Sequence, residues 1–374
     1  MERAQATIDI DAIAANVRRL RATVAGKAAL AAVVKADGYG HGAVRSARAA
    51  QAGGADWIAV VAAKEAVDLR DAGITGPILI MGALTPDEIS VALGAGADVV
   101  AWTPEFLEAV AATAPTGRPA RVHVKLDTGM GRLGTRDPRV ADALVRRAIE
   151  APELQAVGLM THFATADERG DAFMPEQLER FLAWCEPLKA AHPDLVRHAA
   201  NSAATLREPA AHLDLVRCGI AIYGMDPFGE DPDAAGLRPA LGLTSYVAAV
   251  KACAAGQSVG YGRRFVADQD TVIATVPIGY GDGWRRGLTG AADVLIAGRR
   301  FPQVGTVSMD NVTVDLGPDG AGVTVGDEVT LLGRDGDERI LAEDLAAALG
   351  TINYEVTCGL LPRVPRVTSG GAAA

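Results

Sequence analysis

Over its first two-thirds the chain alternates short apolar runs with alanine-rich amphipathic segments, and this alternation constrains the fold more than any other feature. The apolar runs lie at residues 28–35, 57–61, 77–81, 98–102, 121–127, 155–162, 195–201 and 215–222. The helical segments between them include residues 64–72, 86–93, 104–112, 138–150 and 176–191. Several begin with proline, which is favoured in the first turn of a helix. About eight strands alternating with helices over ~235 residues predict a (β/α)₈ barrel of the TIM type, in the α/β class. Periodicity does not show closure, so an open doubly wound sheet stays an alternative.

The pattern changes near residues 236–239. Short β-branched runs bounded by turns follow at residues 243–250, 271–277, 293–296, 311–315 and 328–332, and a short helix is expected at 342–349. Such runs are typical of an all-β module. The chain of 374 residues also exceeds the ~250–300 residues that one core usually serves. We therefore expect a barrel domain over residues 1–236 and a mainly β domain over residues 237–374.

Composition argues against several classes of partner and site. The formal net charge of -10 is unfavourable for a nucleic-acid or anionic-membrane surface. The first nine residues do not resemble a signal peptide, and no apolar stretch is long enough to span a bilayer. The four cysteines form no CxxC pair, so no metal or redox centre is predicted. We expect a cytoplasmic protein with reduced, buried thiols.

Lys35 lies at the end of the first apolar run and directly before a glycine-rich segment, residues 36–42. Burial disfavours the charged form of a lysine, and a neutral amine can condense with a carbonyl to form a Schiff base. The alternative is an ordinary strand-end lysine whose amine extends into water. Position alone gives the two interpretations similar weight, so the rest of the chain must decide.

Like Lys35 at the first strand, other cationic and hydrogen-bonding residues lie at or after the ends of later strands in the predicted barrel. The full set is Lys35, Lys125, Arg132, His162, Asn201, Ser202 and Arg217. The active site of such a barrel lies at the carboxyl ends of its strands, so we expect these residues at one mouth. Each has an ordinary explanation when taken alone: His162 could be a hydrogen-bonded core histidine, and Lys125 could pair with Asp127. Their occurrence together favours a functional site.

An anion site is predicted beside them. Gly219 and Ile220 follow the eighth strand, where barrels commonly hold phosphate on backbone N–H groups, and Ser202 can add a hydroxyl. The glycines of residues 38–42 lack the dinucleotide-binding spacing, and no GxxxxGK[ST] or HExxH motif occurs. A Schiff-base lysine, a phosphate site and an arginine near a ring are what pyridoxal 5'-phosphate (PLP) requires of a protein.

Seven segments resemble, in the same order, motifs of the bacterial alanine racemases. They are residues 33–42 (VVKADGYGHG), 123–134 (HVKLDTGMGRLG), 161–167 (THFATAD), 216–224 (VRCGIAIYG), 259–262 (VGYG), 276–283 (VPIGYGDG) and 307–310 (VSMD). Each is moderately specific, and the ordered set covers nearly the whole chain. The resemblance implies a PLP-binding barrel followed by a β domain, in a homodimer with shared active sites. It also implies interconversion of L- and D-alanine, which supplies D-alanine for the cell wall.

The resemblance further implies a role for each matching residue. Lys35 would hold PLP and serve the D-alanine proton, whereas Tyr261 from a second subunit would serve the L-alanine proton. Arg217 would face the pyridine nitrogen, with His162 supporting it. The positions that match cofactor-binding residues are Lys35, Tyr39, His162, Asn201, Ser202, Arg217, Gly219, Ile220 and Tyr354.

The remaining matching positions concern the substrate. Arg132 and the backbone N–H of Met309 would bind its carboxylate, with Asp310 beside them. Lys125 matches a position that is carbamylated in many members, and the resulting anion would orient Arg132. Tyr280 and Tyr354 match residues that narrow the entry channel, which would favour a small side chain.

Four alternatives stay open at this point. A racemase of wider specificity, for example for serine, would keep both fold and mechanism. A PLP decarboxylase of basic amino acids would keep the fold, and Cys358 raises that question, but its neighbours do not match the decarboxylase motif. A PLP carrier without catalysis would be a single barrel. A class I aldolase using Lys35 would leave the phosphate and arginine residues unexplained.

Overall fold

The computed structural model describes residues 2–24, 26 and 28–371, which form two units. The barrel unit comprises Ile13–Phe228 and Asp233–Leu237. The sheet unit comprises the chain up to Ala12, Gly229–Pro232 and the chain from Arg238 onward. The first residues therefore belong to the sheet unit, although they precede the barrel in sequence.

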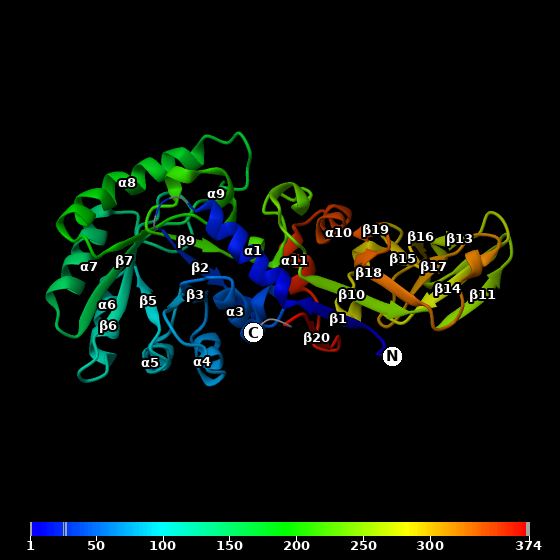
Figure 1. Cartoon of the computed structure of the whole chain (residues 1–374), viewed down its shortest axis with the longest axis horizontal. Helices are drawn as coiled ribbons and strands as arrows, with labels where there is room; N and C mark the ends of the chain where they lie inside the picture. The colour runs from blue at the N-terminus through cyan, green and yellow to red at the C-terminus, as the bar shows by residue number, and fades with distance from the viewer. Residues whose placement is uncertain (1, 25, 27, 372–374) are drawn as a thin grey trace. The chain divides into compact units, whose positions relative to one another are not determined.

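Eight parallel strands form the core of the barrel unit (Figure 1). They are β2 (Ala29–Val33), β3 (Trp57–Val60), β4 (Ile78–Ile80), β5 (Asp98–Ala101), β6 (Ala120–Lys125), β7 (Leu154–Met160), β8 (Val196–His198) and β9 (Leu215–Cys218), in the order β8-β7-β6-β5-β4-β3-β2-β9. The segments of the two end strands also meet: the N–H groups of Asp214 and Arg217 donate to the carbonyls of Arg197 and Ala200, at 3.1 and 2.9 Å. The sheet is thus nearly closed, which confirms the predicted barrel over the open sheet.

Helices follow the strands in alternation, as the sequence pattern predicts. In the barrel unit they include α3 (Ala43–Ala52), α4 (Ala63–Asp71), α5 (Pro86–Gly94), α6 (Pro104–Thr113), α7 (Pro138–Glu150), α8 (Phe173–Ala191) and α9 (Ser202–Arg207), while α1 (Ile10–Thr23) precedes the first barrel strand. Three of them begin at proline next to a capping side chain, for which Thr85, Thr103 and Asp137 accept from backbone N–H groups. Strands β5 and β9 are buried at every residue, as expected where both faces of a parallel sheet are covered.

The sheet unit is built on one long sheet. Its strands are β1 (Gln5–Asp9), β10 (Leu241–Tyr246), β11 (Ala249–Cys253), β14 (Thr271–Val276), β15 (Asp293–Ile296), β16 (Arg299–Val304), β17 (Val312–Asp315), β18 (Glu328–Asp335) and β20 (Arg366–Ser369). Their order is β11-β14-β17-β16-β15-β18-β10-β1-β20, and β19 (Glu338–Ile340) pairs with β18. A separate pair, β12 (Ser258–Val259) and β13 (Phe265–Val266), and helices α10 (Ala342–Leu349) and α11 (Asn353–Cys358) complete it. The mainly β character of this part confirms the prediction.

The structure differs from the sequence prediction in two places within this sheet. The run 243–250 is divided between β10 and β11, because the chain leaves one pairing partner at Tyr246 and takes up another at Ala249. Strands β1 and β20, which no apolar run predicts, pair in parallel with each other, so an early and a late segment of the chain lie in one sheet. None of the described helices is long and apolar enough to cross a membrane.

Candidate active site

Lys35 begins a turn with an unusual backbone. Strand β2 ends at Val33, and Lys35 is the first residue of the short helical segment α2 (Lys35–Tyr39). The φ angles of Ala36, Asp37 and Gly38 are 52°, 51° and 63°, and that of Tyr39 is 54°. This left-handed conformation costs a non-glycine residue roughly 1–2 kcal/mol. Lys35 therefore lies just beyond the strand, at the start of a strained turn, and its side chain is half-buried.

Neighbouring segments hold the strained turn in place. The N–H of Ala36 donates to one carboxylate oxygen of Glu65 at 2.7 Å, and the other oxygen accepts from the loop after β3. Tyr223 donates its hydroxyl to the carbonyl of Val33 at 3.0 Å, and its ring lies 5.1 Å from the ring of Tyr39. The backbone that positions Lys35 is thus fixed from both sides.

Four cationic side chains from three strand ends, those of β2, β6 and β9, act on His162. Burial, and after it the charges of these neighbours, hold the pKa of His162 well below its usual value. In falling order of effect the neighbours are Arg217, Lys125, Arg132 and Lys35. His162 is therefore a neutral imidazole, and the predicted cations do meet at one mouth. Such a concentration of positive charge suits an anionic ligand.

Arg217 is the most deeply buried of these cations, at 2% exposure. Its guanidinium donates to Nδ1 of His198 at 2.9 Å, to Nδ1 of His162 at 3.1 Å, and to the carbonyls of Thr161 and Ala199, both at 2.9 Å. Burial lowers the pKa of Arg217 to about 10. Its Nε is buried and has no acceptor in the described part of the chain. A buried N–H without a partner is costly, so an acceptor absent from the polypeptide is expected there.

The predicted anion site is assembled around Ser202. The N–H of Gly219 donates to the hydroxyl oxygen of Ser202 at 2.9 Å, which joins the loop after β9 to the start of α9. The Tyr39 hydroxyl fills the space where a side chain on Gly219 would lie. Asn201 caps α9 by accepting from the N–H of Ala204 at 3.0 Å. A hydroxyl, the backbone of Gly219 and a phenol thus converge at the point where the sequence places phosphate.

Lys125 is the second buried cation, at 3% exposure. Burial, and then the charges of Arg217 and Arg132, lower the pKa of Lys125 to about 8, against a smaller opposing effect of Asp127. A substantial share of its amines is therefore neutral just above physiological pH. A neutral amine is the form that can react with an electrophile.

Three large apolar side chains are exposed on adjoining loops of the sheet unit. Tyr261 is 75% exposed, Tyr280 40% and Met309 51%. The N–H of Tyr280 donates to the carbonyl of Ser308 at 3.0 Å, and the Thr306 hydroxyl donates to the carbonyl of Tyr261 at 2.6 Å. Three predicted site residues from distant segments are thus presented together.

An ion-pair network fixes two of these loops. Arg3 and Arg363 both pair with the buried carboxylate of Asp282, and Arg363 also pairs with Asp310 at 2.8 Å. Arg3 donates in addition to the carbonyls of Pro277 and Asp310, each at 2.9 Å. The loop with Tyr280 and the loop with Met309 are therefore held to the N-terminal segment of the same unit.

The predicted site residues fall into two groups. The barrel unit carries Lys35, Tyr39, Lys125, Arg132, His162, Asn201, Ser202, Arg217, Gly219 and Ile220, and the sheet unit carries Tyr261, Tyr280, Met309, Asp310 and Tyr354, the last in α11. Sequence reasoning missed Glu65, Asp282 and Tyr223, which hold site segments in place. Asp282 lies in the segment 276–283 that the sequence singles out, but the motif does not show that its carboxylate is buried.

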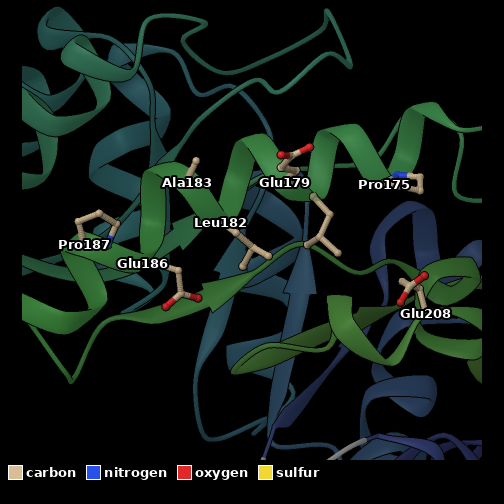
Figure 2. Close-up of a pocket in the computed structure, with 8 residues that line it drawn as sticks. Pro175, Glu179, Leu182, Ala183, Glu186, Pro187 and Glu208 are labelled. Atoms are coloured by element: carbon tan, nitrogen blue, oxygen red, sulfur yellow. The ribbon is translucent and has the colours of Figure 1, made fainter.

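The hollows elsewhere on the molecule have a different character. A shallow groove of about 660 Å³ along α8 is lined by Pro175, Leu178, Glu179, Leu182, Ala183, Glu186, Pro187 and Glu208 (Figure 2). Figure 2 shows the carboxylates of Glu179, Glu186 and Glu208 as its labelled charged groups, and no predicted site residue lines it. No group of histidine, cysteine and acidic side chains among the described residues is arranged to hold a metal.

Comparisons with known proteins agree with this arrangement. Family models for the alanine racemase N-terminal and C-terminal domains match residues 8–227 and 240–368. A curated alanine racemase of Symbiobacterium thermophilum is 44% identical over 370 residues, covering 98% of this chain and 97% of that protein. The crystal structure of an E. faecalis alanine racemase has a TM-score of 0.92 at 40% identity, covering 98% of each chain. That of a Bacillus anthracis alanine racemase with bound L-Ala-P has a TM-score of 0.90 at 36% identity, covering 100% of this chain and 96% of that one. The strained lysine turn, the cationic barrel mouth and the exposed tyrosine loops thus occur in a chain that belongs to the alanine racemase family.

Proposed function

We propose that the chain is a PLP-dependent racemase that interconverts L- and D-alanine as a homodimer. The observation that carries the proposal is the buried, unpartnered Nε of Arg217 at the mouth that also holds Lys35 and Ser202. The amine, the anion site and the ring-facing donor are the three groups that PLP needs. The residues present therefore fit this cofactor.

Each part of the cofactor has matching groups on the chain. The Lys35 amine is the attachment point for its aldehyde. The backbone of Gly219 and Ile220, with Ser202 and Tyr39, is suited to its phosphate, and Tyr354 is a further candidate. When bound, PLP withdraws electrons from the amino acid and so makes the hydrogen on its α-carbon acidic.

Arg217 sets how strongly the ring can withdraw electrons. A guanidinium only donates hydrogen bonds and does not release its proton near neutral pH, so it leaves a facing ring nitrogen unprotonated. His162 and two backbone carbonyls accept from Nη2, and His198 accepts from Nη1, so these contacts prevent Arg217 from turning away. With PLP bound, this arrangement would limit electron flow into the ring, which would favour return of a proton to the α-carbon over transamination.

Racemisation requires a base on each side of the α-carbon. We assign the D-alanine side to Lys35 and the L-alanine side to Tyr261 of a partner subunit. Tyr261 is exposed on its own sheet unit, where Gly260 and Gly262, with φ of 77° and 72°, flank it. A cluster of exposed aromatic and methionine side chains on one set of loops is typical of an interface. This exposure supports a site completed by a second chain.

The substrate carboxylate is assigned to Arg132 and the backbone N–H of Met309. Arg132 belongs to the cation cluster around His162, and the loop of Met309 is fixed through Asp310. Tyr280 and Tyr354 are assigned to the entry channel, where they would restrict large side chains. An enzyme that racemises serine as fast as alanine would favour the wider-specificity alternative.

Lys125 is proposed to carry a carbamate. Its lowered pKa, about 8, supplies the neutral amine that adds to carbon dioxide. The addition forms an N–C bond and releases one proton to solvent, and the resulting carbamate anion would orient Arg132 and relieve repulsion among the buried cations. A carbon-13 signal from labelled carbon dioxide that disappears in Lys125→Ala would establish it, and a free amine in the loaded protein would contradict it.

The proposed setting is the cytoplasm, with D-alanine supplied for peptidoglycan. Cys185, Cys218 and Cys253 are buried free thiols, as expected in a reducing compartment. Burial raises the pKa of Cys185 and of Cys218 to about 12, which keeps these thiols unreactive.

The test uses two inactive variants, Lys35→Ala and Tyr261→Phe. When equal amounts are unfolded and refolded together, half of the dimers contain one chain of each kind. Every such dimer has one site with both bases intact, so about a quarter of the wild-type activity should return. No recovery, despite mixed dimers shown by native mass spectrometry, would refute the shared site. Absence of PLP absorption from the wild-type protein would refute the cofactor assignment.

A further inference from the structure

A buried chain of hydrogen bonds leads from Arg217 through the barrel interior. Nδ1 of His198 lies 2.9 Å from Nη1 of Arg217, and Nε2 of His198 lies 2.9 Å from Nδ1 of His123. Nε2 of His123 lies 3.2 Å from Oδ2 of Asp98. Asp98, His123, His198 and Arg217 are each at most 2% exposed. Arg121, which is partly exposed, closes the far end with two hydrogen bonds to Asp98 of 2.7 and 3.1 Å.

In each hydrogen bond of this series, the donor and the acceptor are determined by the groups at the two ends, Arg217 and Asp98. A guanidinium can only donate, so Nδ1 of His198 must accept, and the proton of a neutral ring is then on Nε2. That proton is donated to Nδ1 of His123, which leaves the proton of His123 on Nε2. This proton in turn is donated to Asp98. Both histidines are therefore held as neutral Nε2–H tautomers between a cation and an anion.

We infer that Asp98, His123 and His198 are positioning residues, and that Asp98 sets the tautomers which hold Arg217 with its Nε directed at the cofactor site. The inference about the tautomers stands on the chain's own residues. Its consequence for the cofactor rests on the proposed function. In the described part of the chain, the partners of Arg217 are two imidazoles and two carbonyls, so Asp98 is the negative charge that it reaches through hydrogen bonds.

The residues packed around His123 and His198 fix the positions of these hydrogen-bonded side chains. The ring of His123 occupies the space where a side chain on Gly158 of β7 would lie, so glycine is required there. Trp57 packs with its ring 5.6 Å from that of His123 at an interplanar angle of 88°. Burial, and then the charge of Arg217, hold the pKa of His198 well below its usual value, which keeps it neutral. Burial alone would raise the pKa of Asp98, but His123 and Arg121 outweigh it and lower the pKa, which keeps Asp98 anionic.

Asp98→Asn should reverse both tautomers without removing any atom from the histidines. The shorter of the two bonds from Arg121 runs from Nε to Oδ1 of Asp98, at 2.7 Å, and this charged donor should keep the single oxygen of an asparagine at the Oδ1 position, with the amide nitrogen at the Oδ2 position. The amide N–H₂ must then face Nε2 of His123 and donate to it. The proton of His123 moves to Nδ1, and that of His198 moves to Nδ1 in turn. His198 would then present a donor to the donor of Arg217, and the guanidinium would be displaced.

The test is nitrogen-15 NMR of the histidine side chains in the full-length protein as purified, together with Asp98→Asn and Arg121→Gln. In the wild type and in Arg121→Gln, which keeps the carboxylate, His123 and His198 should be protonated at Nε2. In Asp98→Asn both should be protonated at Nδ1. His212, whose Nε2 donates to the carbonyl of Thr205 at 2.9 Å outside this series of hydrogen bonds, serves as an internal reference.

Activity supplies a second readout. Asp98→Asn should lower kcat for alanine about tenfold or more with little change in KM, because the displaced group faces the cofactor and not the substrate carboxylate. Wild-type tautomers opposite to those stated, or unchanged tautomers in Asp98→Asn, would overturn the inference. If Asp98→Asn does not fold, the wild-type spectrum alone still shows whether His123 and His198 are protonated at Nε2. An absence of racemase activity with the stated tautomers would instead count against the proposed function alone.

Discussion

The hydroxyl of Tyr39 occupies the space that a side chain on Gly219 would need. Tyr39 belongs to the strained turn after Lys35, and Gly219 follows the last barrel strand, so this approach joins the first and last strand ends of the barrel. The N–H of Gly219 meanwhile donates to the hydroxyl oxygen of Ser202. The lysine turn and the anion site are therefore one packed assembly.

Gly219→Ala should weaken PLP binding about tenfold or more. The new methyl group would contact the Tyr39 hydroxyl and push either the phenol or the anion-binding backbone out of place. Titration of cofactor-free protein with PLP, followed by absorbance, measures the dissociation constant. Gly94→Ala is the matched control, because a Cβ there meets nothing within 4 Å. Equal PLP affinity in Gly219→Ala and the wild type would show that the close approach is unimportant.

Lys125→Met should stabilise the protein at neutral pH in buffer free of carbon dioxide. Because the folded-state pKa is lowered to about 8, the unfolded chain binds the proton more tightly. The buried charge then costs up to about 3 kcal/mol below pH 8, and this cost disappears as the pH rises to about 10.5. Urea unfolding of variant and wild type at pH 7 and pH 10 measures the difference. The exposed Lys251→Met is the control, and a difference that grows with pH would contradict the prediction.

Tyr261→Phe should separate proton exchange from racemisation. With Lys35 intact, D-alanine should exchange its α-hydrogen for deuterium in heavy water, while racemisation falls about 100-fold or more for lack of the opposite base. L-alanine should exchange slowly. Proton NMR of each enantiomer over time gives the rates. Rapid exchange of both enantiomers would assign both faces to Lys35.

Arg363→Ala should raise KM for alanine roughly 3- to 10-fold, with a smaller change in kcat. The substitution removes the pairs to Asp282 and Asp310 and loosens the loop that presents the N–H of Met309. Loss of ground-state binding appears mainly in KM. Steady-state kinetics measure the changes in KM and kcat separately. Arg300→Ala, which removes surface pairs to Asp293 and Glu338, should leave both constants unchanged.

Local sequence signals account for much of the fold. The helices predicted at 138–150 and 342–349 have these bounds in the structure, because proline, capping residues and glycine mark their ends. The strands β1 and β20 gave no such signal. Gln5–Asp9 and Arg366–Ser369 are short and partly polar, and they are strands because each completes the other's hydrogen bonds. Such long-range pairing is not readable from either segment alone.

The candidate site, like the fold, could be predicted from the sequence only in part. Cations at strand ends could be collected from the sequence, because barrel topology brings all carboxyl ends to one mouth. The chain from Arg217 to Asp98 could not, since its members are spaced widely along the sequence and meet only inside the barrel. A histidine within the apolar run of β6 is the signal available, and by itself it indicates only a hydrogen-bonded core residue. The left-handed turn after Lys35 was also unreadable, because alanine, aspartate and tyrosine rarely adopt that conformation.

That turn has a consequence for local motion. Ala36, Asp37 and Tyr39 together carry roughly 3–6 kcal/mol of backbone strain, whereas β2 just before them is paired on both sides, with β3 and β9. Segments of low local stability open first, and their amide hydrogens exchange first. Although Glu65 and Tyr223 hold the turn, its strain lowers the free energy of opening it, so we expect its amides to exchange sooner than those of β2. Anything that immobilises the Lys35 side chain would slow exchange in the turn and leave the strand unchanged, so the amides of Gly38 and Gly40 record whether the lysine is occupied.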